Sequence, residues 1–318
     1  MLPAYLEAYK KNKLRGLADE AMEMLKDCSI CPRKCSVNRL RGQKGTCRIG
    51  LFARVYSYLA HHGEEPPVSG SRGSGTIFFS GCNMRCVYCQ NYEFSQSDKG
   101  KDVTANELAG IMLELQKEGV HNINLVTPTH VLPQILEALD IAVKKGLNIP
   151  LVYNTSGYED KDVIRILEGI VDIYLVDMRY ADRELSEKYS KAKDYPEYNR
   201  EAVLEMHRQV GTAKIDEEGL IDKGLIIRHL VLPNNLSGTE EIARFLRDEV
   251  SQNTYVSLMS QYAPYYKAPD FSEINRRITL KEYLDAQKLL SDYGIENGWI
   301  QQAGGLKRLA GVNIKPAV

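Results

Sequence analysis

Apolar positions along the chain follow two periods, one typical of amphipathic helices and one typical of buried strands. Spacings of three and four residues place apolar side chains on one helix face in residues 107–118, 132–143, 163–170, 200–209, 240–250 and 280–291. Short apolar runs lie between these segments, at residues 76–79, 122–126, 149–153, 173–176, 225–232 and 254–259. Strands that alternate with helices of this length indicate βαβ units and a parallel sheet.

This alternation predicts an α/β fold, a partial (β/α)6 TIM-like barrel, in preference to a full eight-stranded barrel. Thr104 with Glu107 forms a capping box before the first of these helices, and Gly146 follows the second as a stop signal. Barrels of this kind carry their chemistry at the C-terminal ends of the strands. We expect two parts: residues 1–70 with an N-terminal helix and a four-cysteine metal module, and residues 71–318 with the barrel, a C-terminal helix and a tail.

Composition and charge narrow the class of protein. Hydrophobic residues make up 43% and charged residues 26% of the 318, and the net charge is −1, which predicts no nucleic-acid partner and no attraction to acidic membranes. No apolar run approaches the roughly 18 residues of a membrane span, and the N-terminus lacks a signal-peptide core. We therefore expect a cytoplasmic protein without a membrane partner.

Four of the seven cysteines lie near the N-terminus, as Cys28, Cys31, Cys35 and Cys47. In a cytosolic chain with an odd number of cysteines, metal binding or catalysis is expected in preference to disulfides. Four thiolates suit tetrahedral zinc and equally suit a second iron–sulfur cluster. A structural zinc that stabilises a small module is the favoured interpretation, and four unliganded thiols are the alternative.

The other three cysteines form a C-x3-C-x2-C run, Cys82, Cys86 and Cys89, directly after the first predicted strand. A [4Fe–4S] cluster normally takes four thiolates. Three thiolates in this run would hold three irons and leave the fourth iron open to a small molecule, as in a catalytic metal site with a free position. The alternatives are buried apolar filling and half of a zinc site.

The same run resembles the radical S-adenosylmethionine (SAM) superfamily, including the aromatic Tyr88 before the last cysteine. The residues leading into Cys82, Thr-Ile-Phe-Phe-Ser-Gly, and the Cys-Gln-Asn that begins at Cys89 are similar to pyruvate formate-lyase activating enzymes and their uncharacterised relatives. The resemblance implies a [4Fe–4S] cluster that reduces SAM, a 5′-deoxyadenosyl radical that abstracts a substrate hydrogen, and a low-potential donor such as flavodoxin or ferredoxin. It further implies a protein or peptide substrate.

SAM ligands are expected at the strand ends. Asn154-Thr155-Ser156-Gly157 is similar to the Asp-Thr-Asn-Gly of activating enzymes, so the resemblance implies that Asn154 and Ser156 bind the cofactor. Asn154 would bond a ribose hydroxyl, and a bond to its own backbone in a turn is the alternative. Asp177-Met178-Arg179 is similar to their Asp-Leu-Lys, so Arg179 would neutralise the SAM carboxylate. A structural ion pair between Asp177 and Arg179 is the alternative.

Three further residues are candidates of lower specificity. The Gly-Gly-Glu that holds the SAM amine in many radical SAM enzymes is absent after residues 122–126, so Thr127 or Thr129 would substitute. Arg228 lies inside an apolar run, which predicts that it points into the barrel or pairs with an acid.

Two other segments are interpreted as structural. Glu64-Glu65-Pro66-Pro67 is expected to form a turn before the barrel, and residues 261–266 are expected to cover its mouth in preference to gripping a substrate.

Three functions follow from these observations. The first is a radical SAM enzyme of activating type that acts on a polypeptide. The second is a radical SAM enzyme that acts on a small molecule or a cofactor precursor. The third is a non-catalytic iron–sulfur or zinc protein that transfers electrons, which would need a fourth ligand on the cluster. The absence of an eighth cysteine counts against the third.

Overall fold

A computed structural model describes residues 2–301 and confirms the α/β fold with a mostly parallel sheet. The six predicted strands are all present and neighbour one another in chain order. They are β2 (Ser74–Phe79), β4 (Ile123–Val126), β5 (Leu151–Thr155), β6 (Ile173–Asp177), β8 (Ile221–Leu230) and β9 (Tyr255–Met259), each parallel to the next. Strand β5 begins two residues later than predicted, which places Asn154 inside the strand.

The sheet is larger than predicted because short strands extend both edges. Strand β1 (Ala53–His61) pairs antiparallel with β2, and β3 (Lys101–Val103) pairs antiparallel with β1. At the other edge, β10 (Gly298–Ile300) lies parallel to β9, and β7 (Lys214–Ile215) forms a hairpin with β8. The sheet runs from β10 to β3 without closing within the described residues, as expected for a partial barrel.

All six predicted helices are present. They are α5 (Ala105–Glu118), α6 (Leu132–Lys144), α7 (Lys161–Ile166), α9 (Tyr195–Val210), α10 (Thr239–Phe245) and α11 (Leu280–Asp292). The Thr104 and Glu107 capping box is formed as predicted, and a single π turn, Leu246–Val250, continues α10. The chain also forms α1 (Ala4–Lys10), α2 (Lys13–Glu23), α3 (Pro66–Ser69), α4 (Tyr92–Ser95) and α8 (Arg183–Ser190). Single 3-10 turns lie at Arg39–Arg41, Thr129–Val131, Pro233–Asn235 and Ala268–Asp270.

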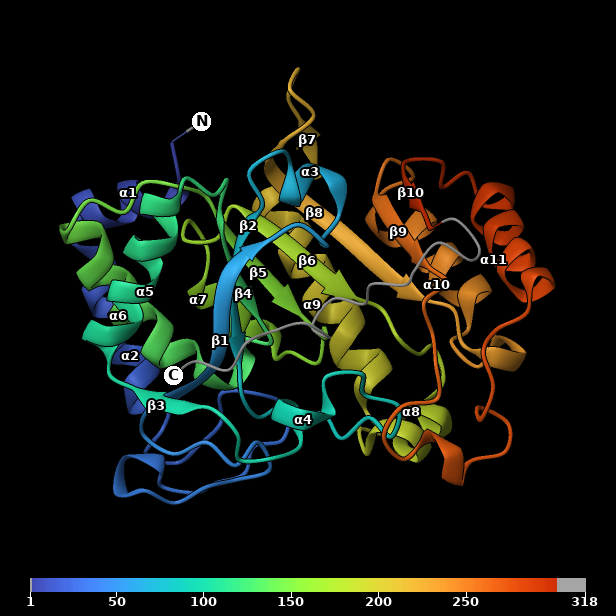
Figure 1. Ribbon diagram of the computed structural model, residues 1–318, viewed down its shortest axis with the longest axis horizontal. Coiled ribbons are helices and arrows are strands. Elements are labelled where there is room, and N and C mark those ends of the chain that lie inside the picture. Colours follow the sequence, from blue (N-terminus) through green and yellow to red (C-terminus); the bar gives the residue numbers. More distant parts are fainter. Residues whose placement is uncertain (1, 302–318) are drawn as a thin grey trace.

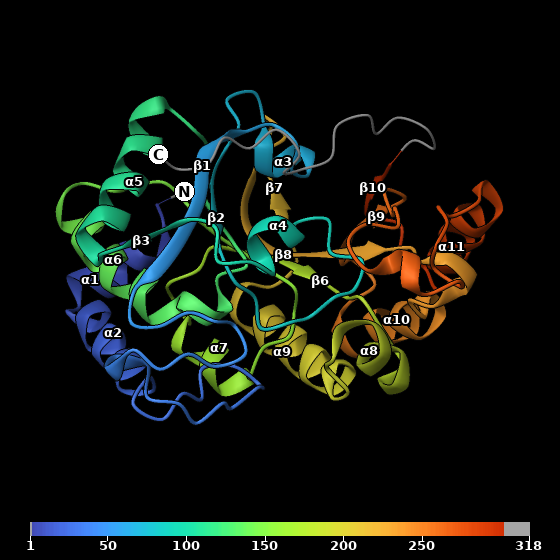
Figure 2. The same ribbon diagram turned by 60° about the horizontal axis from the view of Figure 1, so that its bottom comes forward.

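The helices form an outer layer around the sheet (Figure 1). Helices α5 and α6 cover the β1 side and α10 and α11 the β9 side, and α1 and α2 lie outside α6 (Figure 2). Tyr5 in α1 donates a hydrogen bond to the carbonyl of Ile149 at 2.7 Å, which ties the N-terminus to the loop before β5. No helix within residues 2–301 combines the length and the apolar character of a membrane span.

The division of the chain near residue 70 stays a prediction. Strand β1 precedes that boundary and nevertheless pairs along most of its length with β2, the first barrel strand. The tail expected after the last helix lies, beyond residue 301, outside the described residues.

Candidate active site

The C-x3-C-x2-C loop begins where the buried strand β2 ends, and hydrogen-bond donors reach each of its sulfurs. The backbone N–H of Met84 lies 3.3 Å from Cys82 Sγ. Cys86 Sγ accepts from Ser190 Oγ at 3.0 Å, and Cys89 Sγ lies 3.2 Å from Ser95 Oγ. Burial raises the pKa of the Cys82 thiol to about 12 and that of Cys89 to about 11. Coordination to a metal would instead stabilise all three as thiolates.

Backbone contacts hold this loop in place. The amides of Arg85 and Val87 donate to the carbonyls of Ser190 and Tyr189, at 3.1 and 2.8 Å. Gly81 opens the loop with φ +78°, and a Cβ there would lie 2.5 Å from the carbonyl oxygen of Cys47. The loop is therefore packed directly against the N-terminal cysteine segment.

A cavity of about 1120 Å³, including its open mouth, extends from this loop into the barrel. Its lining contains Cys89 of the motif and most of the predicted SAM ligands, namely Tyr88, Thr127, Asn154, Ser156, Asp177, Arg179 and Arg228. Gln261, Tyr262 and Tyr265 also line it, and the ring of Tyr262 lies 5.6 Å from that of Tyr88. Part of the segment 261–266 therefore forms cavity wall, and its covering of the barrel mouth stays a prediction.

Asp177, the last residue of β6, lies between two arginines. Its Oδ2 accepts hydrogen bonds from Arg179 Nε at 3.1 Å and Nη2 at 2.5 Å, and its Oδ1 accepts one from Arg228 Nε at 2.7 Å. Burial raises the pKa of Asp177, but the two guanidinium groups outweigh burial and hold that pKa below its ordinary value. The ion pair considered from the sequence is formed, and Arg179 still faces the cavity.

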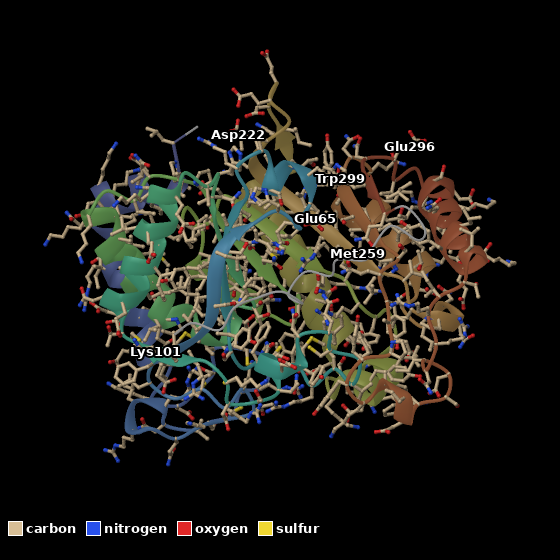
Figure 3. The ribbon with its side chains drawn as sticks, in the orientation of Figure 1. Glu65, Lys101, Asp222, Met259, Glu296 and Trp299 are labelled. Carbon is tan, nitrogen blue, oxygen red and sulfur yellow. The ribbon has the colours of Figure 1, made fainter. Side chains whose placement is uncertain are left out.

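Two carboxylates that sequence reasoning had assigned to a turn also line the cavity. Glu64 Oε2 lies 3.4 Å from Asn154 Nδ2 and 3.7 Å from Arg228 Nη1. Glu65 lines the same cavity and is only 9% exposed, and its Oε2 has no hydrogen-bond partner within residues 2–301. Figure 3 shows Glu65 near the middle of the sheet, below α3, with Met259 toward β9.

No local signal identifies Glu64 and Glu65 as site residues. They precede α3, which lies at the opposite end of the strands from the cysteine loop (Figure 1). Their partners Asn154 and Arg228 lie far along the chain, so only the tertiary fold brings them to the cavity.

The loop after β5 is shaped by helix α9, which sequence reasoning also missed. Tyr195 Oη donates to the carbonyl of Ser156 at 2.8 Å, and Asn199 Nδ2 donates to the carbonyl of Gly157 at 3.1 Å. Gly157 has φ +76°, and a Cβ there would lie 2.1 Å from Asn199 Nδ2. The hydroxyl of Ser156 is buried in the cavity wall without a partner within residues 2–301 and is free to bind a ligand.

The two threonines proposed for the SAM amine lie in different places. Thr127 follows β4, has φ +57° and lines the cavity. Thr129 does not line the cavity; it is fully buried, and its hydroxyl donates to Glu159 Oε1 at 2.5 Å. Burial raises the pKa of Glu159 to about 7.

The four N-terminal cysteines lie together, beside Gly81 of the motif loop. Cys31 interacts electrostatically with each of Cys28, Cys35 and Cys47. As the side chains stand, no three His, Cys, Asp or Glu residues within residues 2–301 are placed to hold a metal ion. Metal binding by either cysteine set therefore requires its thiol groups to rotate toward one another.

Comparison with known protein families gives one match over most of the barrel. The sequence profile of the radical SAM superfamily matches residues 76–246, from the first barrel strand into α10. This range contains all three motif cysteines and every predicted SAM ligand.

The chain is also similar to individual proteins. The chain is 35% identical over 301 residues to an uncharacterised protein of Methanocaldococcus jannaschii, covering 92% of this chain and 82% of that one. It is 29% identical over 111 residues to the pyruvate formate-lyase-activating enzyme of Clostridium pasteurianum, covering 33% of this chain and 45% of that one. Among solved structures, a radical SAM methyltransferase from Sphaerobacter thermophilus is similar at TM-score 0.45 and 17% identity, covering 71% of this chain and 65% of that one.

Proposed function

Because this chain belongs to the radical SAM superfamily and is therefore a radical SAM enzyme, we propose that it abstracts hydrogen from a polypeptide, as glycyl-radical activating enzymes do. One observation carries the proposal: the Cys82, Cys86 and Cys89 loop and a buried, charged strand-end site open into a single cavity. Similarity to a pyruvate formate-lyase-activating enzyme over 111 residues supports the polypeptide substrate. Electron transfer without catalysis is set aside, because the superfamily is one of enzymes.

The chemistry of the donor set fits a [4Fe–4S] cluster. Three free cysteines supply three thiolates, and no fourth cysteine lies in the loop. When bound and reduced, the cluster supplies one electron to the sulfonium of SAM, which yields methionine and a 5′-deoxyadenosyl radical that takes a substrate hydrogen atom. Ser190 and Arg179 donate to Cys86 Sγ at 3.0 and 3.4 Å and would stabilise its negative charge.

The remaining SAM contacts are assigned from the cavity wall. Arg179 would bind the SAM carboxylate through its guanidinium, with Asp177 holding that guanidinium in place. Ser156 has a free buried hydroxyl and Asn154 lies beside it, so we assign both to the ribose. Thr127 is the candidate for the SAM amine because it lines the cavity and Thr129 does not. Tyr88 forms part of the wall, and Arg228 supports Asp177 and Asn154.

Two further cofactor and partner assignments belong to this proposal. Cys28, Cys31, Cys35 and Cys47 would hold a second metal centre, zinc or an iron–sulfur cluster. The electron would come from a low-potential donor, as radical SAM enzymes generally require, and flavodoxin or ferredoxin is the expected class.

The test is anaerobic assay of 5′-deoxyadenosine after reconstitution and reduction with dithionite in the presence of SAM. We expect product from the wild type and none from Cys86→Ala. To identify the hydrogen source, peptides with one Cα-dideuterated glycine in randomised flanks are added, and deuterium is expected in the product. An intact, reduced cluster that yields no 5′-deoxyadenosine with or without these peptides would contradict the proposal.

Glu65 favours a second candidate, a small substrate that carries an ammonium or amide group. Glu65 lines the cavity, and its Oε2 is buried without a hydrogen-bond partner within residues 2–301. A donor group would satisfy this buried acceptor, which is otherwise costly to leave unpaired. Deuterium transfer from a perdeuterated alkyl diamine, reduced in Glu65→Gln, would support this candidate. Transfer from the glycine peptides, unaffected by Glu65→Gln, would exclude it.

A further inference from the structure

The N-terminal cysteine segment carries an excess of basic side chains, of which Lys34 pairs with Asp160 at 3.2 Å. Residues 28–52 contain six basic side chains and no acidic one. Arg48 is the sharpest case, because Nε and Nη2 of its guanidinium are buried without a hydrogen-bond partner in the described part of the chain. Guanidinium stays protonated in proteins, and a buried cation without an anionic partner is strongly unfavourable.

Arg48 belongs to a group of arginines that lies between the two cysteine sets. Burial lowers the pKa of Arg85 most, the charges of Arg48 and Arg33 lower it further, and Cys82 and Cys47 raise it. These four groups are two further cations and one cysteine from each set, and none is a carboxylate. The missing negative charge is therefore expected on the sulfurs.

A backbone donor in this segment also points at sulfur. Cys35 Sγ accepts a hydrogen bond from the amide of Thr46 at 3.4 Å. Cys82 of the motif loop likewise accepts one, with the amide of Met84 as donor. N–H donors stabilise a thiolate more than a thiol, because hydrogen bonds to the charged form favour that form.

From this geometry we propose that Cys28, Cys31, Cys35 and Cys47 hold one metal centre as four thiolates, whose negative charge is balanced by Arg48 and Arg85. The inference deepens the second metal site of the proposed function. Four thiolates carry four negative charges, so a Zn²⁺ centre has net charge −2 and a [4Fe–4S]²⁺ centre also has net charge −2. Either centre supplies the anion that the buried arginines lack.

This centre would also support the radical SAM loop. Arg33 Nε donates to the carbonyl of Asn83 at 2.8 Å, and Arg85 Nη2 donates to the carbonyl of Thr46. Each cysteine segment thus donates one arginine hydrogen bond to a backbone carbonyl of the other. Ordering the N-terminal segment around a metal would thus fix one wall of the loop that begins at Gly81.

The first experiment measures metal in full-length protein that lacks the motif cysteines, Cys82→Ala/Cys86→Ala/Cys89→Ala. We expect about one zinc, or about four irons with matching sulfide, and loss of that metal when Cys28→Ala and Cys47→Ala are added. If both proteins contain only the same background amount of metal, the proposal is overturned. The parent variant holds no radical SAM cluster, so the result does not depend on whether the enzyme cleaves SAM.

The second experiment tests the charge balance with Arg48→Met, and Arg41→Met serves as the exposed control from the same segment. Loss of a supporting contact outside the ligand set typically weakens metal binding about 10–100-fold. We therefore expect at least about tenfold weaker retention against a chelator in Arg48→Met and wild-type retention in Arg41→Met. If no anionic centre is present, Arg48→Met instead removes an unpaired buried charge, and the variant melts at a higher temperature with no change in metal content.

Discussion

Arg179 Nη1 lies 3.4 Å from Cys86 Sγ, while Nε and Nη2 of the same guanidinium bind Asp177 Oδ2. The end of β6 is thereby joined to the second cysteine of the motif loop. A SAM molecule whose carboxylate reached Arg179 would be held beside the cluster by the same group that contacts the cluster ligand. In the proposed chemistry, Arg179 would therefore contribute both to SAM binding and to the environment of the cluster.

Replacing Arg179 by methionine should weaken SAM binding. A charge-assisted hydrogen bond contributes about 1.5–3 kcal/mol, so we expect roughly a 10–100-fold higher Kd, with partial recovery in Arg179→Lys. Anaerobic equilibrium dialysis with labelled SAM measures the effect. Arg183→Met is the control, since Arg183 pairs with Glu197 on the surface of α8. Wild-type affinity in Arg179→Met would remove Arg179 from the SAM site.

Asp177→Asn should destabilise the fold by about 3–5 kcal/mol, because it removes the anion bound by Arg179 and the nearer of the anions beside Arg228. Asp98→Asn removes an exposed pair with Arg54 at 3.7 Å and should cost at most about 1 kcal/mol. Urea unfolding of the two variants measures the difference. Equal midpoints would contradict the assignment of Asp177 as the anion of this network.

The same residue predicts a pH dependence. Because the folded-state pKa of Asp177 lies below its ordinary 3.8, its stabilisation is present above that value and is lost as pH falls through the folded pKa. The wild type should therefore lose stability more steeply than Asp177→Asn below about pH 4. Thermal melts of both proteins across this acid range test the prediction, and parallel curves would contradict it.

Glu159 should affect stability in the opposite direction as pH rises. Burial raises its pKa from 4.5 to about 7, so the stability it contributes falls as pH rises between these values and stays lower above them. Glu159→Gln should match the wild type near pH 5 and exceed it near pH 8 by roughly 1–3 kcal/mol. Urea midpoints at both pH values measure this, with the exposed Glu201→Gln as control. A variant less stable than the wild type at the higher pH would contradict the prediction, because it would mean that ionisation of buried Glu159 does not destabilise the fold.

Gly81→Ala tests the contact between the two cysteine segments. The new Cβ would lie 2.5 Å from the carbonyl of Cys47, whereas Gly119, also at positive φ, has nothing within 4 Å. Both variants share a backbone cost of about 1–2 kcal/mol, and only Gly81→Ala should also lower the iron retained by the motif loop. Iron and sulfide analysis after anaerobic reconstitution reads this out. Equal iron in both variants would mean that the contact does not position the loop.

Features that depend on local patterns were predictable from the amino-acid sequence. Alternating periods predicted all six parallel strands and six helices, because a buried strand and an amphipathic helix each need a repeating apolar pattern. The cysteine motif was evident because its ligands lie within eight consecutive residues. Short edge strands such as β3 and β10 were missed because three residues are too few for a period to appear.

Contacts between side chains far apart in the sequence became known from the three-dimensional fold. It placed Glu64 against Arg228, Asn199 under Gly157, and the arginines between the two cysteine sets. It also separated Thr127 from Thr129, two residues apart, because positive φ at Thr127 ends the extended strand and the following turn directs Thr129 into the core. Such partners depend on how strands are ordered and side chains directed in three dimensions, and no spacing along the chain records that arrangement.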